Sequence, residues 1–194
     1  LGDVYMRQGL LTAIVVVMQF ISMGLRFGTF SITLTLIPIV VGSALYGWGS
    51  GAWLGFVFGV TVLLTGDANL FLAVNIPGTI ITVILKGTLA GAAAGFVYKL
   101  ISKKNQIAAV IVSAVVAPVV NTGIFVLGSY VFFFDYLSGL AEGTNLFVFI
   151  LVGLVGINFF IELGINLVLN PAILQIIRIG KKNFGGKNQI IKTK

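Results

Sequence analysis

Two charged residues lie inside long apolar runs of this sequence, and their chemistry is the most informative feature of the chain. Lys86 lies in the run Thr79–Ile101, and Glu162 lies in the run Leu146–Ile177. If these runs cross a membrane, each buried charge costs about 2.5–3.5 kcal/mol, so such a group usually faces a partner or a polar cavity. A Lys86–Glu162 pair could be purely structural, since a buried pair is weak evidence for stability. We favour a site that binds a solute.

Polar side chains recur at helical spacing in the last three apolar runs. The three sets are Thr79, Thr82 and Lys86; Asn121 and Ser129; and Asn158, Glu162, Asn166 and Asn170. Residues three, four, seven or eight positions apart share a face of a helix. A single amide inside a membrane more often joins two helices, but several amides at one depth indicate a pocket.

Two loops add candidate binding residues to these polar faces. The segments Arg26–Ser31 and Gly66–Gly78 could cover a pocket, although both could equally be plain connectors. The predicted substrate-binding residues are Arg26, Asn75, Lys86, Asn121, Asn158 and Glu162.

Six apolar runs must position these residues. They are Leu10–Leu25, Phe30–Tyr46, Gly51–Thr65, Thr79–Ile101, Ile107–Phe134 and Leu146–Ile177. Of the 194 residues, 58% are hydrophobic and 9% are charged, whereas a soluble domain contains about 25% charged residues. Apolar runs of this length predict membrane helices. We therefore predict an all-α integral membrane protein with six transmembrane helices in one domain, residues 1–180, followed by a basic cytoplasmic tail, residues 181–194.

The distribution of basic residues predicts the orientation of the chain. With the N-terminus inside and six crossings, ten of the twelve Lys and Arg residues fall on the inner side. Arg26 falls outside, and Lys86 lies within a helix. This asymmetry follows the positive-inside rule, so both termini are predicted to be cytoplasmic. We interpret the basic tail as a solvated topogenic segment, with attraction to anionic lipid or to an acidic partner as the alternative.

Small residues repeat every four positions in the first and third runs. Gly9 and Ala13 form one pair, and Gly51, Gly55 and Gly59 form a longer series. This spacing places small residues on one helix face and lets two helix backbones approach closely. The partner helix could belong to the same bundle or to another membrane protein. All five residues are therefore candidates for docking a partner.

Residues that are missing argue against several classes of function. The sequence contains no Cys and no His, which excludes disulfides, thiol catalysis and Cys/His zinc sites. It contains no G-x-x-x-x-G-K-[ST] phosphate loop, and Glu162 is the only acid within an apolar run. We predict no enzymatic activity, no catalytic residue, no cofactor and no metal. The net charge of +7 is explained by membrane topology, so we expect no nucleic-acid partner.

Two segments carry a resemblance to a known family. The short run Leu34–Gly42 leads into the hairpin Gly47–Ser50 and then into the pattern G-x-x-x-G-x-x-F-G at Gly51–Gly59. This arrangement resembles the substrate-binding S component of energy-coupling-factor (ECF) vitamin transporters, and Ala117–Phe125 is also similar to some members. The resemblance covers nearly the whole chain.

The resemblance implies a division of labour among the helices. It implies six helices with both termini inside, and a vitamin pocket in the outer half shaped by helices four to six. Helices one to three would contact a membrane-embedded coupling (T) subunit through an Ala-x-x-x-Ala motif, whose nearest match here is Gly9-x-x-x-Ala13. Two partner ATPases would power uptake through the plasma membrane, and the S component would topple within the bilayer to release its vitamin.

The last three runs look most like the pantothenate-type members. By this resemblance, Lys86 or Arg26 would meet the carboxylate of pantothenate, and Asn121 and Asn158 would bind its polar backbone. Glu162 would orient Lys86 or accept a hydroxyl. The sequence therefore predicts a high-affinity S component for pantothenate or a similar small polar vitamin. The alternatives are another vitamin within the family, a structural or assembly subunit that binds no ligand, and a stand-alone channel.

Overall fold

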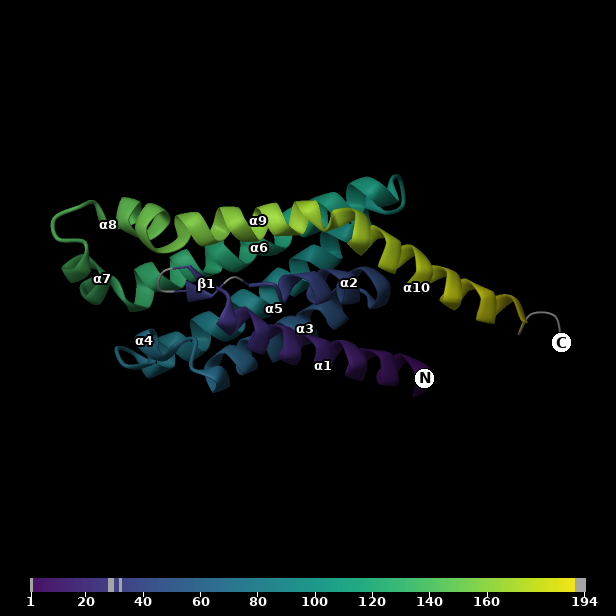
Figure 1. The fold of residues 1–194 in the computed structure, drawn as a ribbon, viewed down its shortest axis with the longest axis horizontal. Coiled ribbons are helices and arrows are strands. Elements are labelled where there is room, and N and C mark those ends of the chain that lie inside the picture. Colours follow the sequence, from purple (N-terminus) through teal and green to yellow (C-terminus); the bar gives the residue numbers. More distant parts are fainter. Residues whose placement is uncertain (1, 28–29, 32, 191–194) are drawn as a thin grey trace.

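The structure, a computed structural model, describes residues 2–27, 30–31 and 33–190 and is almost entirely helical (Figure 1). Its long helices are α1 (Gly2–Gly24), α3 (Trp48–Thr65), α5 (Ile76–Ile101), α6 (Gln106–Phe132) and α10 (Asn170–Ile190). Its shorter elements are α2 (Leu36–Tyr46), α4 (Asn69–Leu72), α7 (Phe134–Leu140), α8 (Leu146–Val148), the π-helix η1 (Phe149–Gly156) and α9 (Ile157–Val168). The strands β1 (Arg26–Phe27) and β2 (Phe30–Ser31) form an antiparallel pair after α1.

Several of the described helices meet the length and hydropathy of a membrane span. They are α1 from Met6 to Gly24, α3, α5 and α6. The segments Leu146–Gly153 and Ile157–Val168 are bent by 41° and give a fifth span if they are counted together. The protein is therefore a multi-pass membrane protein. A sixth crossing and the cytoplasmic position of both termini stay predictions, since α2 has only 11 residues.

The second predicted run begins later as a helix than we expected. Phe30–Tyr46 was predicted as one helix, but β2 occupies Phe30–Ser31 and α2 begins only at Leu36. Pro38 provides a physical reason, because a helix running through it would lose the hydrogen bond to the carbonyl of Leu34. With α2 starting at Leu36, Pro38 lies in the first turn, where its missing N–H has no partner to lose.

The last predicted run is divided in the structure. Leu146–Ile177 was predicted as one helix, but α9 ends at Val168 and α10 begins at Asn170. Pro171 accounts for the break, because it has no N–H to donate to the carbonyl of Leu167, and in the first turn of α10 none is needed. The second helix then continues to Ile190, past the start of the predicted tail at residue 181.

Helices α3 and α5 make the closest backbone contact in the bundle. A Cβ on Gly51 would meet the carbonyl of Gly91, and a Cβ on Gly55 would meet the carbonyl of Gly87. A Cβ on Gly59 would lie 2.9 Å from the carbonyl oxygen of Val83. Gly51, Gly55 and Gly59 therefore face α5 inside the bundle. The prediction that these three glycines dock a partner protein is corrected to packing within the chain.

The other predicted docking pair has different surroundings. Gly9 and Ala13 are exposed on α1, and a Cβ on Gly9 would meet nothing within 4 Å. Only 17% of the α1 span is buried, against 33–44% for α3, α5 and α6. Their role in docking stays a prediction.

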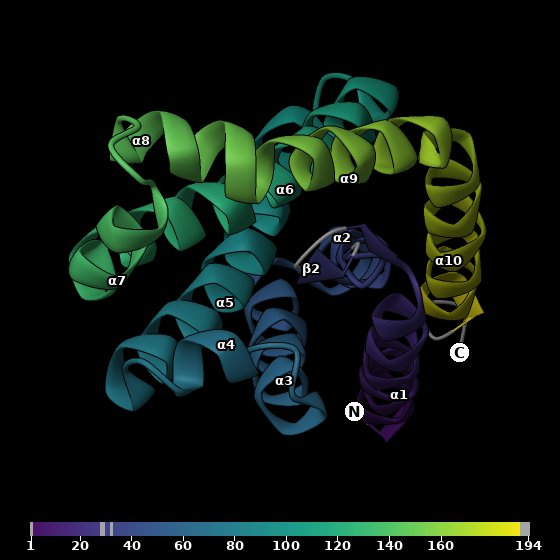
Figure 2. The same cartoon turned by 60° about the vertical axis from the view of Figure 1, so that its left-hand side comes forward.

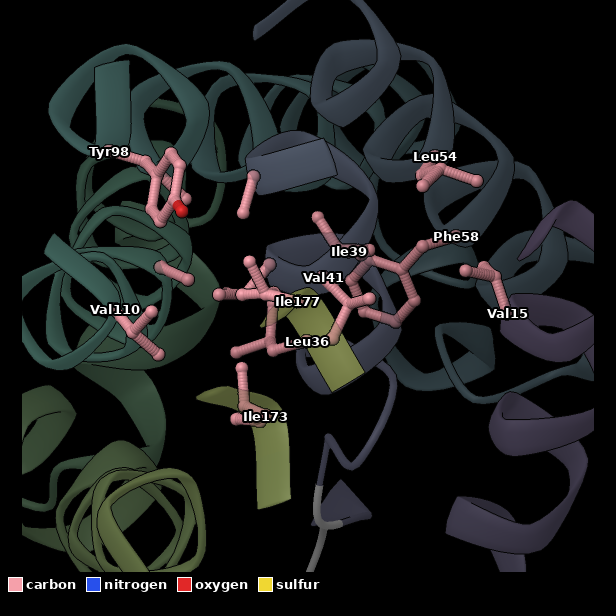
Figure 3. Packing of buried hydrophobic residues seen from close by; sticks show 14 of the residues in the cluster. Val15, Leu36, Ile39, Val41, Leu54, Phe58, Tyr98, Val110, Ile173 and Ile177 are labelled. Carbon is pink, nitrogen blue, oxygen red and sulfur yellow. The ribbon is translucent and has the colours of Figure 1, made fainter. Parts of the chain in front are cut away.

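The short helix α2 lies at the centre of the hydrophobic core. Leu36, Ile39 and Val41 pack with Phe58 of α3 and Ile177 of α10 (Figure 3). In Figure 2 the helices α1, α3 and α10 stand around α2. The buried α2 therefore anchors the polar segment that precedes it, residues 33–35.

Candidate functional site

A pocket of about 540 Å³, its open mouth included, lies where the polar faces of α5, α6 and α9 meet. Side chains from α1, α3, α5, α6, η1 and α9 line it, together with two connecting segments. The lining residues are Gln19, Thr33, Phe58, Val62, Asp67, Lys86, Asn121, Thr122, Phe125, Val155, Asn158, Phe159 and Glu162.

Four of the six predicted substrate-binding residues line this pocket. They are Lys86 on α5, Asn121 on α6, and Asn158 and Glu162 on α9. These residues are far apart in the sequence, and three separate helices bring them together. The convergence that their spacing predicted is thus present in the fold, while their role in binding a solute stays a prediction.

The remaining two predicted residues have other positions. Asn75 is not in the lining, and its Oδ1 accepts a hydrogen bond from the N–H of Gly78 at 2.9 Å. Its Nδ2 donates to the carbonyl oxygen of Phe132 at 3.3 Å. Asn75 therefore caps α5 and ties it to the end of α6. The side chain of Arg26 lies outside the described residues, although its backbone belongs to β1.

Lys86 is held among aromatic and acidic side chains. Its Nζ lies 5.8 Å from the centre of the Phe58 ring and 5.4 Å from the centre of the Phe125 ring. Both distances suit attraction between a cation and an aromatic face. Its ammonium also interacts electrostatically with the carboxylates of Glu162 and Asp67. Rings from α3 and α6 thus hold the ammonium in the pocket, which Glu162 and Asp67 also line.

Glu162 joins the pocket to the segment that precedes α2. The side chain is only 6% exposed, and its Oε1 accepts a hydrogen bond from the N–H of Thr33 at 2.9 Å. Ser22 on α1 accepts from the N–H of Leu34 at 3.3 Å. Gln19, also on α1, accepts from the hydroxyl of Thr35 at 3.3 Å. Residues 33–35 are therefore fixed between α9 and α1, and they form a wall of the site.

Helix ends and irregularities direct other groups toward the pocket. Gly66 ends α3 at φ 80°, a left-handed conformation that favours glycine, and the chain turns there so that Asp67 reaches the pocket. The 41° bend between Leu146–Gly153 and Ile157–Val168 falls just before Asn158. The π-helix η1 leads into this bend, and such helices are frequent at functional sites.

Several buried amide atoms in the lining make no hydrogen bond within the part of the chain that the structure describes. They are Nε2 of Gln19, Oδ1 of Asn121 and Oδ1 of Asn158. A buried polar group left without a partner costs about 1–3 kcal/mol. The side chains of Gln19, Asn121 and Asn158 line the pocket, so unused donor and acceptor groups lie close to it.

Sequence reasoning missed part of the lining. Gln19 is the only amide in the first apolar run, and that isolation was a signal that could have identified it. Asp67 was assigned only to an outer loop. Phe58, Phe125 and Phe159 carried no signal, because the chain contains 16 Phe residues and the sequence does not distinguish lining rings from packing rings.

Comparisons with known proteins agree with this architecture. The family model described as "ECF transporter, substrate-specific component" matches residues 6–174. Among solved structures, that of ThiT from Listeria monocytogenes is similar, with a TM-score of 0.66 and 21% sequence identity. The match covers 93% of this chain and 96% of the other. At this identity it shows a shared fold. Among curated protein sequences, none matches.

Proposed function

The chain belongs to the family of substrate-specific components of ECF transporters, and we propose that it binds a small water-soluble vitamin in the pocket around Lys86. The observation that carries this proposal is the convergence of Lys86, Asn121, Asn158 and Glu162 from three helices on one cavity. Isolated polar groups that only join helices would not need to line one shared pocket. Members of this family supply substrate recognition rather than catalysis, and ATP hydrolysis belongs to their partners.

The pocket chemistry supports a solute that is partly apolar and partly polar. Phe58, Phe125 and Phe159 offer ring faces to a planar or aliphatic part. Asn121 and Asn158 offer amide groups to hydroxyl, amide or heterocyclic nitrogen atoms. Such a combination of apolar walls and few convergent polar groups is typical of small-molecule sites.

The charge of the solute separates the candidate vitamins. In the pantothenate prediction, Lys86 binds the carboxylate, while Asn121 and Asn158 bind the hydroxyl and amide groups. The lining contains the acids Asp67 and Glu162 with the single base Lys86. An anion therefore adds to the negative charge of the lining, whereas a neutral or cationic vitamin does not. A panel that contains all three charge classes decides among them.

The exposed face of α1 supports an assembly with partner subunits. Met6, Leu10 and Phe20 are 69%, 63% and 60% exposed, and Gly9 and Ala13 lie on the same poorly buried helix. We propose that this face docks on a membrane-embedded coupling (T) subunit and that two ATPase subunits power uptake. The complex would reside in the plasma membrane with both termini of this chain in the cytoplasm. Toppling of the S component within the bilayer would release the solute.

Ligand-induced thermal stabilisation tests the proposed binding. The detergent-solubilised protein is heated with each member of a vitamin panel, and one class of compound should raise Tm. Lys86→Ala should abolish that rise. Lys103→Ala, which removes a charge from an exposed turn outside the pocket, should keep it. A panel without any response, in protein that is folded and free of bound solute, argues against vitamin binding.

Copurification combined with the vitamin panel separates this proposal from the assembly-subunit alternative. An S component and an assembly subunit would both bring down a coupling subunit and two ATPases. If those partners copurify but no compound stabilises the protein, the chain is an assembly subunit, and the contacts of Glu162 only hold the fold together.

A further inference from the structure

Helix α10 differs from the membrane spans of this protein. Although its 21 residues would be long enough to cross a bilayer, it is not among the helices apolar enough to do so. It leaves α9 at a steep angle (Figure 2), runs nearly parallel to α1 in both views, and extends toward the end of the molecule where the N-terminus also lies (Figure 1). This helix takes no part in the pocket described above.

One face of α10 anchors the helix to the bundle. Ile173 and Ile177, four residues apart, are 1% and 0% exposed and belong to the central core. A Cβ on Gly180 would lie 2.8 Å from the side chain of Leu45 on α2. The Nζ of Lys181 lies 4.9 Å from the centre of the Tyr98 ring on α5. The orientation of α10 about its own axis is therefore fixed by packing.

That orientation leaves two further faces outward, and they differ in chemistry. Ile176 and Ile179, three residues apart, are 50% and 54% exposed. Arg178, Lys181 and Lys182 are also exposed and share a different face, because they too are three and four residues apart. At 100° per residue, the centres of the apolar and basic faces lie about 140° apart, and the faces approach each other at Ile179 and Lys182, about 60° apart.

The charge of this region has one sign only. From Leu163 to Lys194 the sequence contains six Lys and Arg residues and no Asp or Glu. A helix end that exposes both apolar and purely basic surface suits the boundary between acyl chains and headgroups, where basic side chains bury their stems and keep their charges in water. Basic residues next to a membrane span are also attracted to anionic lipid.

We propose that the exposed part of α10 leaves the membrane core and binds anionic phospholipids at the membrane surface where both termini lie. Ile176 and Ile179 enter the boundary of the acyl chains, and Arg178, Lys181 and Lys182 bind lipid phosphate groups. The long stems of the basic side chains cover apolar surface while their charged ends reach the headgroups. An acidic soluble protein would satisfy the charges but would leave the two isoleucines in water, so lipid fits both faces. This proposal is independent of the solute pocket.

Native mass spectrometry of the purified full chain tests the lipid selectivity. Phosphatidylglycerol and phosphatidylcholine with the same acyl chains are titrated, and the wild type should retain phosphatidylglycerol preferentially. Arg178→Gln/Lys181→Gln/Lys182→Gln should weaken its retention by about fivefold for each charge removed, or roughly 100-fold together at low salt. The control Lys99→Gln/Lys103→Gln/Lys104→Gln removes the same charge from exposed positions at the α5–α6 connection and should keep most of the selectivity.

Each contrary result of this titration overturns the proposal. Equal losses in both triple variants would mean that only net charge matters. An unchanged α10 variant would mean that its basic face binds no lipid. An α10 variant that keeps its lipids but loses a copurifying protein would identify the face as a protein-docking surface.

Spin labelling tests the position of α10 with the fold intact. Because the sequence contains no cysteine, single variants Ile176→Cys, Ile179→Cys and Lys182→Cys can be labelled in nanodiscs without background. Labels at 176 and 179 should collide more often with oxygen than with a water-soluble nickel complex, and the label at 182 should show the reverse. Equal nickel access at all three positions would place α10 in water and overturn the proposal.

Discussion

The substitution Gly55→Ala tests the packing of α3 against α5, which holds two of the helices that line the pocket. A Cβ at this position would meet the carbonyl oxygen of Gly87, with the carbonyl carbon of Gly87 at 2.5 Å and the amide nitrogen of Thr88 at 3.0 Å. All three are backbone atoms. They cannot rotate away as a side chain would, so the two helices must separate.

The expected magnitude follows from two opposing effects. Overpacking of a well-packed interior costs about 1–3 kcal/mol, and replacing Gly by Ala inside a helix returns up to ~1 kcal/mol. Since the contact is with backbone, the net loss should be about 1–2 kcal/mol. For a chain of this size that loss corresponds to a fall in Tm of roughly 2–8 °C.

The intrinsic fluorescence of Trp48 and Trp53 during heating in detergent measures this change. Gly123→Ala is the matched control, because it is also a helical glycine but a Cβ there would meet nothing within 4 Å. The control should leave Tm unchanged or raise it slightly. If Gly55→Ala is as stable as Gly123→Ala, the close approach of α3 and α5 is refuted, and the three glycines return as candidates for docking a partner.

Three further substitutions separate structural from binding roles. Glu162→Ala removes the acceptor for the N–H of Thr33 and leaves that donor unsatisfied, which costs about 1–3 kcal/mol, so its Tm should fall below that of Glu162→Gln, whose amide oxygen still accepts; equal Tm values would contradict this bond. Asn75→Ala removes the cap of α5 and should lower the free energy of unfolding by about 0.5–2 kcal/mol. The solute affinity measured by isothermal titration should stay unchanged, and a weaker affinity would mean that Asn75 does contribute to the binding site. Phe125→Ala removes one ring beside Lys86, worth about 0.5–2 kcal/mol, and should raise the solute Kd roughly 2- to 30-fold, whereas an unchanged Kd would exclude this ring from binding.

Residues borne by long helices were the most predictable part of the site. Lys86, Asn121 and Glu162 lie on helices whose face is determined by spacing alone, because a helix repeats every 3.6 residues. Their convergence required only that the polar faces avoid lipid. The same argument could not reach Asp67 or Thr33, which lie between helices, where the path of the chain depends on tertiary contacts.

The glycine series of α3 was predicted with its partner helix left open. Spacing of four marks a helix face for close approach, but it does not say whether the approaching helix belongs to the same chain. The sequence nevertheless contains a matching series at Gly87, Gly91 and Gly95 on α5. In the structure Gly55 faces Gly87 and Gly51 faces Gly91. When one chain contains two glycine series of the same spacing, the two helices that carry them can pack against each other, and no partner protein is needed to explain either series.

Helix boundaries were the least predictable features, and proline was responsible at both places. Pro38 and Pro171 lie within continuous apolar runs, and hydropathy alone does not register a missing backbone N–H. Because of this, the predicted sixth helix included the first residues of α10. The predicted basic tail then began at residue 181, in the middle of that helix.

Mass spectrometry of the small molecules that copurify with the protein tests the central claim most directly. The account predicts one organic solute of vitamin size bound to the wild type in a one-to-one ratio and lost from Lys86→Ala, while Lys103→Ala retains it. If the wild type and Lys86→Ala carry the same solute in the same amount, the pocket around Lys86 is not the binding site and the proposed function is contradicted.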